Sequence, residues 1–325
     1  MIEKLSLSVY RFTLLPLDVI RMPRLNKGNI LRGAFGSSLK ELVCAGDRSV
    51  GCEACILNQR CAYNLIFNPS GLIDVKRLRN LPRGYVLKPP LSEETEYDSS
   101  FPLTFDMVLI GDRIKYLPYV IVPLIELGRA GIGLNRGKFR LRSIEVIKDG
   151  SAIPIYDPTD NMVKNIDGTI SGKELIEKAK TMDGESIALR FLTPTRIRYN
   201  PTGEKGKSIV LRTPEFHHIL RRLRDRVNAL LVAYCGGPID ADFKEIAERG
   251  MAVRKTASDL KWIEIKRRSR TQSSEHDQSG FVGRVTFAGD LAEFLPLLLS
   301  GEYVHVGEDT VFGNGWYRIE SGRSK

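Results

Sequence analysis

The chain has 325 residues, of which 42% are hydrophobic and 27% are charged, and this composition is typical of a globular protein. No apolar run approaches the ~20 residues that a membrane-spanning helix needs, and residues 1–10 alternate in polarity, unlike a signal peptide. These features exclude membrane proteins, favour a cytoplasmic location and allow two domains, while the net charge of +10 favours a polyanionic partner.

The first half of the chain predicts strands and helices in the order β-α-β-β-α-β. Apolar residues alternate in the predicted strands and recur at helical spacing in the predicted helices. The elements cover residues 4–15, 29–43, 85–87, 101–110, 117–128 and 138–148. This order is that of a ferredoxin-like domain. Gly33 and Gly36 each cost the first helix roughly 1 kcal/mol relative to Ala, so we expect another part of the chain to approach closely there.

Four of the five cysteines lie in a short insert after the first helix, with the spacing C-x7-C-x2-C-x5-C: Cys44, Cys52, Cys55 and Cys61. In a cytoplasmic protein such a cluster indicates metal binding or reduced thiols. Four thiolates suffice for tetrahedral zinc, and the C-x2-C pair is a typical zinc knuckle. The cluster therefore predicts a structural zinc site, with four reduced thiols or an iron–sulfur cluster as alternatives. The isolated Cys235 is expected in the core.

The second half repeats the order β-α-β-β-α-β after a polar connection at residues 150–184. Its predicted elements cover residues 186–199, 213–235, 260–266, 281–287 and 290–299, followed by a final strand, with an additional polar helix at 242–254. The predicted fold class is therefore α+β, with two tandem ferredoxin-like domains. The first domain spans residues 1–185 and contains the cysteine insert at 44–61, and the second spans residues 186–325.

Positive charge is concentrated in the second half. Residues 190–226 contain ten Lys or Arg against three acids, and residues 266–270 add four more basic side chains, Lys266, Arg267, Arg268 and Arg270. This clustering favours nucleic-acid binding, with a solvated basic face as the alternative. In the first helix, Arg32 and Lys40 lie off the apolar face, where they could meet phosphates or water.

A glycine-rich stretch, His305 to Tyr317, precedes the final strand. Its glycines allow positive φ angles, and backbone N–H groups in such a loop suit an anion such as phosphate. A plain turn before the strand is the alternative. Residues 128–137 form a similar stretch at the corresponding place in the first half.

Two motifs carry a resemblance to a known family: Leu31-Arg32-Gly33-Ala34-Phe35-Gly36 before the cysteine cluster, and the stretch from His305 to Tyr317. Together with the tandem domains, they resemble the CRISPR-associated precursor-crRNA processing endoribonucleases of the RAMP superfamily. The resemblance implies metal-independent cleavage of repeat RNA in antiviral defence, by attack of a ribose 2′-hydroxyl that leaves 2′,3′-cyclic phosphate and 5′-hydroxyl ends. It implies no cofactor for catalysis.

The partners that this resemblance implies are CRISPR repeat RNA or precursor crRNA and other CRISPR-associated effector subunits. The sequence leaves open whether the protein forms a homodimer. A non-catalytic RAMP-type subunit that binds crRNA within an effector complex is the alternative function. A zinc-dependent hydrolase is a third reading, but no histidine or carboxylate cluster accompanies the cysteines to make an open catalytic site.

Many relatives in this family carry a catalytic histidine in the first helix, but here that helix contains none. We therefore predict His305 as the catalytic residue, with a hydrogen-bonded strand histidine as its alternative role; His218, His217 and Lys40 are the alternative catalytic residues. Histidine is suited to proton transfer because its unperturbed pKa lies near neutrality. The predicted RNA contacts are Arg32, Lys40, Arg196, Arg221, Arg222, Gly307, Thr310, Gly313, Asn314 and Gly315.

Overall fold

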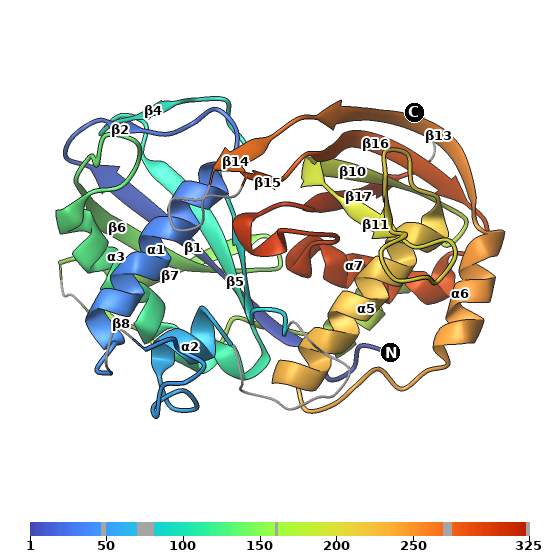
Figure 1. Ribbon diagram of the computed structural model, residues 1–325, viewed down its shortest axis with the longest axis horizontal. Helices are drawn as coiled ribbons and strands as arrows, with labels where there is room; N and C mark the ends of the chain where they lie inside the picture. The colour runs from blue at the N-terminus through green and yellow to red at the C-terminus, as the bar shows by residue number, and fades with distance from the viewer. Residues whose placement is uncertain (47–49, 70–80, 160–161, 269–274, 323–325) are drawn as a thin grey trace. The chain divides into compact units, whose positions relative to one another are not determined.

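The computed structural model describes residues 1–46, 50–69, 81–159, 162–268 and 275–322 (Figure 1). It divides the chain into two compact units, each of mixed helix and sheet. The N-terminal unit comprises Leu5–Ile170 and Ala229–Gly237, and the C-terminal unit comprises Met1–Lys4, Ser171–Asn228 and Pro238–Lys325. None of the helices in these described ranges is both long and apolar enough to span a membrane.

The N-terminal unit contains a ferredoxin-like sheet in the strand order β3-β5-β1-β6, in which all neighbouring strands are antiparallel. Its elements follow one another as β1 (Ser6–Pro16), α1 (Lys27–Val43), β3 (Tyr85–Lys88), β5 (Leu103–Ile110), α3 (Pro118–Ala130) and β6 (Phe139–Lys148). This is the predicted β-α-β-β-α-β order. Around it lie β2 (Ile20–Arg21), α2 (Ala62–Ile66), β4 (Glu96–Tyr97), the 3-10 helix η1 (Gly111–Tyr116), β7 (Ser151–Asp157), β8 (Met162–Val163) and β9 (Thr169–Ser171).

Helix α1 packs beside α3 in this unit, as Figure 1 shows, and it buries its apolar face. Leu31, Phe35 and Leu39 are buried at the spacing that the sequence predicts. At Gly36 the ring of Phe67 occupies the space that a Cβ would need. The expected close approach is therefore confirmed at Gly36, whereas a Cβ at Gly33 would meet nothing within 4 Å.

The C-terminal unit repeats the arrangement with the strand order β13-β16-β10-β17. Its elements follow as β10 (Ser186–Thr195), α5 (Phe216–Tyr234), β13 (Arg254–Ile263), β16 (Gly280–Ala288), α7 (Leu295–Val304) and β17 (Tyr317–Ser321). Phe191 and Phe281, from neighbouring strands, pack edge to face with ring centroids 4.9 Å apart. The additional elements are α4 (Gly172–Ala179), β11 (Ile197–Tyr199), β12 (Ile209–Leu211), α6 (Phe243–Ala252), β14 (Lys266–Arg268), β15 (Glu275–Asp277), and the 3-10 helices η2 (Ala292–Phe294) and η3 (Thr310–Phe312).

Residues 150–184 are more ordered than the polar connection that the sequence predicts. They contain three strands and helix α4, which begins with a capping box between Ser171 and Glu174. Helix α4 buries Leu175 and Ala179 and packs against α7. Residues 171–185 therefore lie in the C-terminal unit, although the predicted boundary at 185/186 assigns them to the first domain.

The edge of the second sheet also differs from the prediction. Strand β13 begins six residues before the predicted strand at 260–266, and most of its side chains are exposed, so alternation is a weak signal there. Strands β14 and β15 pair between the predicted strands at 260–266 and 281–287, where the sequence predicts no element. Residues 269–274 lie outside the described residues.

Candidate nucleic-acid interface

An open pocket of about 410 Å³ lies on the C-terminal unit, between the β11–β12 hairpin, the end of β13 and the β14–β15 pair. Its charged and aromatic lining consists of Arg196, Arg212, Trp262, Glu264, Lys266 and Asp277. We call it the Trp262 pocket. Cations beside an aromatic face are the usual means of holding nucleic acid, because phosphates pair with the cations and bases stack on the ring.

Arg212 and Trp262 form the open side of this pocket. The Arg212 guanidinium lies over the indole ring, 5.0 Å from its centroid, and the Arg212 side chain is exposed whereas Trp262 is half-buried. Neither residue was predicted from the sequence. The available signal was a tryptophan four positions before the basic stretch that begins at Lys266.

Arg196, a predicted RNA contact, lies in the wall of the same pocket. Its Nη1 is 2.9 Å from an Asp277 carboxylate oxygen and also donates to the Ser279 carbonyl, and its Nε is 3.3 Å from Glu308. Hydrogen bonds from Ser279, together with the Arg196 charge, keep the pKa of Asp277 below its ordinary value. Two carboxylates thus share the charge of Arg196, which leaves Arg212 and Lys266 better placed to attract phosphate.

The glycine-rich loop is held mainly by bonds within the protein. Its amides at Val306, Glu308, Phe312, Gly313, Gly315 and Trp316 all donate to oxygens of the C-terminal unit. At Gly315, with φ 75°, a Cβ would collide with the carbonyl of Val306. These six amides are therefore engaged, and the loop resembles a packed turn more than an anion seat.

Most of the predicted RNA contacts in this loop are buried, namely Thr310, Gly313, Asn314 and Gly315. Gly307 is partly exposed, together with Glu308 and Asp309, whose negative charges do not favour phosphate. RNA contact by the loop stays a prediction, and the structure gives its buried residues an internal role.

His305 lies at the start of the loop and is fully buried. Its Nδ1 is 3.1 Å from the carbonyl oxygen of Asn314, and its ring stacks on Trp316 with centroids 5.8 Å apart and planes 4° from parallel. The catalytic role predicted for His305 stays a prediction, and this burial counts against it. The structure instead supports the alternative of an internally hydrogen-bonded histidine, although at a helix end and not in a strand.

His218 and His217 lie at the start of α5, and both rings have lowered pKa values. Burial, followed by the neighbouring His217, lowers the pKa of His218 to about 4, so that its ring is neutral near pH 7. Burial also lowers the pKa of His217. The Nδ1 of His218 accepts a hydrogen bond from the Glu215 amide. The remaining proton of the neutral ring is therefore on Nε2, which suits hydrogen-bond donation better than proton abstraction. His276, in β15, is exposed.

The N-terminal unit brings two arginines together. Arg32, from α1, and Arg83 lie close enough for the charge of Arg32 to add to burial in lowering the pKa of Arg83. Arg32 also lies over the ring of Phe67, with its guanidinium carbon 4.2 Å from the centroid. Tyr85 is buried beside them, and burial raises the pKa of its hydroxyl. Arg83 Nε donates a hydrogen bond to the Phe67 carbonyl oxygen, so both guanidinium groups lie at Phe67. Two positive charges at one place favour an anion, so Arg32 is in a suitable place for its predicted role, with Arg83 as a partner that was not predicted from the sequence.

The other predicted contacts lie elsewhere on these two units. Arg221 is exposed and Arg222 is half-buried on α5 of the C-terminal unit. Lys40, near the end of α1, lies 5.8 Å from the ring centroid of Tyr63 and lines a small pocket with the clustered cysteines. Lys40 thus lies beside the possible metal ligands and is not among the residues that line the Trp262 pocket.

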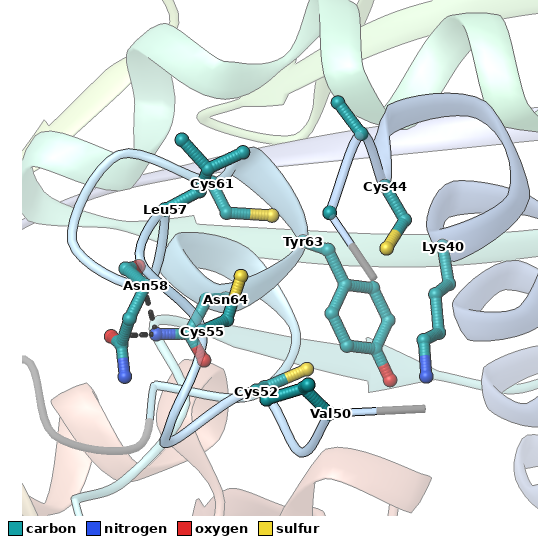
Figure 2. A pocket seen from close by; sticks show the side chains of 12 residues that line it. Lys40, Cys44, Val50, Cys52, Cys55, Leu57, Asn58, Cys61, Tyr63 and Asn64 are labelled. Carbon is teal, nitrogen blue, oxygen red and sulfur yellow. Dashed lines mark hydrogen bonds between the residues drawn. The ribbon is translucent and has the colours of Figure 1, made fainter. Parts of the chain in front are cut away.

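The four clustered cysteines line that pocket in the N-terminal unit (Figure 2). Burial raises the pKa of the Cys52 thiol. The positive charge of Lys40 lowers that pKa, and negative charge on the other three cysteines would raise it further. Within the described ranges, no three His, Cys, Asp or Glu side chains are arranged to hold a metal ion as they stand.

Comparisons with known families cover most of the chain. A family model described as the CRISPR-associated endoribonuclease Cas6 matches residues 189–317, which include the Trp262 pocket and the glycine-rich loop. A second model, AF_1859_N, described as an N-terminal domain, matches residues 5–167, half of the chain. An uncharacterized protein of Archaeoglobus fulgidus is 27% identical over 299 residues, which cover 90% of this chain and 91% of the relative.

Solved structures share the fold at low sequence identity. A Thermus thermophilus Cas6 in a product complex has a TM-score of 0.59 and 16% identity, with 97% of this chain and 99% of that chain covered. A second Cas6 product complex has a TM-score of 0.55 and 18% identity, with 97% and 100% covered. A chain of a partial Cas6-RT-Cas1–Cas2 complex has a TM-score of 0.60 and 13% identity, with 98% of this chain and 46% of that chain covered. The likeness confirms two tandem ferredoxin-like domains.

Proposed function

Because the chain belongs to the Cas6 family of CRISPR-associated endoribonucleases, we propose that it cuts CRISPR repeat RNA by attack of a ribose 2′-hydroxyl on the adjacent phosphate. The 5′-oxygen leaves, and the products carry a 2′,3′-cyclic phosphate and a 5′-hydroxyl. The nucleophile belongs to the RNA, so the protein supplies orientation, proton transfer and positive charge. The observation that carries the proposal is the Cas6 match over residues 189–317.

The RNA ligand is proposed from the relatives and from the Trp262 pocket. The similar structures include Cas6 product complexes and a Cas6 substrate-mimic complex. In this chain, Trp262 can stack on an unpaired base while Arg212 and Lys266 meet the neighbouring phosphates. Binding of other CRISPR-associated subunits, as in the Cas6-RT-Cas1–Cas2 complex, stays a prediction for this chain.

For the chemical step, the structure best supports charge stabilisation. Arg32 and Arg83 both contact Phe67 and provide two guanidinium groups for the negative charge that grows on the phosphate oxygens. His305, His218, His217 and Lys40 remain the proposed residues for proton transfer. The lowered pKa and engaged Nδ1 of His218 make it a poor base, and Lys40 lies beside the cysteines.

The proposal is tested by incubating the purified protein with its repeat RNA in the presence of EDTA. We expect cleavage at one position, a downstream product that polynucleotide kinase labels without prior dephosphorylation, and an upstream product that resists periodate until its cyclic phosphate is removed. The matched control is the same RNA with a single 2′-deoxynucleotide at the cleavage position. It should bind with unchanged affinity and remain intact, because it lacks the nucleophile.

Cleavage of the deoxy substrate, or a 5′-phosphate on the product, would refute attack by the 2′-hydroxyl. Intact repeat RNA that nevertheless shifts in a gel would instead support the non-catalytic RAMP-type subunit. Activity that EDTA abolishes and added metal restores would contradict a metal-independent reaction.

A further inference from the structure

The four clustered cysteines lie at the two ends of, and within, the loop that connects α1 and α2. Cys44 directly follows α1, Cys61 directly precedes α2, and Cys52 and Cys55 lie in the segment between them. Figure 2 shows the four sulfur atoms around the space between this loop and the end of α1. Cysteines up to 17 positions apart in the chain therefore line one pocket, which we call the cysteine pocket.

The loop has no apolar core of its own. Between residues 50 and 61, the only side chains that are not exposed are those of Cys52, Cys55, Asn58 and Cys61. Ile56 is 99% exposed, and Val50 and Leu57, which line the pocket beside the cysteines, are 42% and 38% exposed. Asn58 accepts hydrogen bonds from Asn64 of α2 through its carbonyl and side-chain oxygens, which fixes one side of the loop. Hydrophobic burial therefore contributes little to holding the remaining turns, and three of the four side chains in this range that are not exposed are thiols.

We propose that Cys44, Cys52, Cys55 and Cys61 bind one Zn²⁺ as four thiolates and thereby tie the end of α1 to the start of α2. Zinc prefers four sulfur ligands in tetrahedral geometry, and C-x2-C turns commonly supply two of them. The cysteine pocket measures about 30 Å³, which is enough for a single small ion. Binding replaces four thiol protons with one metal ion and involves no change of oxidation state.

Binding requires the sulfur atoms to move closer together than they are in the structure. The surrounding segment can adjust, because it consists of short turns with exposed side chains. Lys40 lines the same pocket, and its positive charge offsets the net charge of about −2 on zinc with four thiolates. No catalytic role is assigned to this zinc, since four protein ligands leave no open position for substrate.

The expected effect of zinc is on the position of α1. Phe67 directly follows α2, packs at Gly36 of α1 and lies under the Arg32 guanidinium. A zinc link between the two helices through Cys44 and Cys61 therefore also fixes the position of the Phe67 ring, over which the Arg32 guanidinium lies. The zinc site is independent of the proposed cleavage reaction, and it can be present in a protein that does not cut RNA.

The test measures metal in the full-length protein, purified under reducing conditions from zinc-supplemented cells. We expect about one zinc per chain by mass spectrometry of the metal, and release of that zinc when four thiols react with a mercurial reagent. Replacement by Co²⁺ should give the visible bands of a tetrahedral ion and the strong near-ultraviolet band of thiolate-to-cobalt charge transfer. These readouts need no variant and no RNA.

Cys52→Ser and Cys55→Ser should each lose most of the bound metal and lower the melting temperature. Cys235→Ser is the matched control, because Cys235 lies in the same unit without lining the cysteine pocket, and it should keep the full zinc content. Absence of metal after reconstitution with Zn²⁺, with all thiols still reactive, would overturn the proposal. Iron with acid-labile sulfide would also overturn it, as would disulfides between these cysteines in the freshly purified protein.

Discussion

At the scale of single residues, His305 combines burial with an unusual backbone conformation. Its φ of 62° and ψ of 171° lie in a region that glycine adopts readily and other residues adopt at a cost of about 1–3 kcal/mol. The surrounding structure must hold it there, and the contacts with Asn314 and Trp316 are the visible means. We infer that His305 positions the glycine-rich loop, which is a different role from the proton transfer predicted from the sequence.

This inference predicts that glycine at position 305 destabilises the protein less than alanine does, which is the reverse of their usual order. Both His305→Ala and His305→Gly lose the ring contacts, and each leaves the Asn314 carbonyl without the His305 partner, at a cost of about 1–3 kcal/mol. Glycine also relieves the backbone strain, so we expect His305→Gly to melt at a higher temperature than His305→Ala. Thermal unfolding of the two variants and the wild type measures this order.

The pH profile of cleavage separates positioning from proton transfer. If His305 acts through the loop, both variants should cleave more slowly while the shape of the profile is unchanged. Loss of one limb of the profile in both variants would show that His305 itself transfers a proton, as the sequence analysis predicts.

At the scale of elements, the two sheets were predictable from the sequence, and the Trp262 pocket of the C-terminal unit was not. Period-2 alternation marks β1 and β10, and apolar residues at helical spacing mark α1 and α5, so the repeated β-α-β-β-α-β order can be read directly. The exposed strand β13 and the helix α4 carry weaker patterns. The capping box that begins α4 could have been found, since it is a local sequence signal.

The elements around the Trp262 pocket lead to a prediction about stacking. Trp262→Ala should weaken the binding of repeat RNA by about 5- to 150-fold, because stacking of one base on an aromatic side chain contributes roughly 1–3 kcal/mol. Trp262→Phe keeps an aromatic face and should recover much of the affinity. Filter binding with the uncleavable deoxy substrate measures both variants without interference from cleavage. Equal affinities for Trp262→Ala and the wild type would remove this pocket from the RNA interface.

At the scale of the whole molecule, net charge predicted the class of partner but not which residues form the binding site. The net charge of +10 predicts a polyanion, and the Cas6 family match agrees with it. Arg212 and Trp262 are 50 positions apart, however, and a side-chain contact between elements of two different sheets brings them together. Arg32 and Arg83 are similarly distant in the chain. Local spacing cannot reveal such pairs, whereas the four cysteines are close enough in sequence to be recognised as one cluster.

The balance of charge also predicts how RNA affinity depends on salt. Each phosphate contact that is lost should reduce the slope of log affinity against log salt concentration by about 0.7 for single-stranded RNA. We therefore expect Arg212→Ala and Lys266→Ala each to lower the slope by roughly this amount, since both side chains are exposed at the Trp262 pocket.

Arg249→Ala provides the matched control for this measurement. Arg249 is also exposed, but its guanidinium lies 2.6 Å from Glu293 on the same unit and is further paired with Glu245. Its charge is thus already balanced by carboxylates, and its removal should leave the slope unchanged. If the slopes of all three variants match the wild type, the phosphates are held elsewhere. If Arg249→Ala lowers the slope as much as Arg212→Ala, RNA binding follows net charge and not the geometry of this pocket.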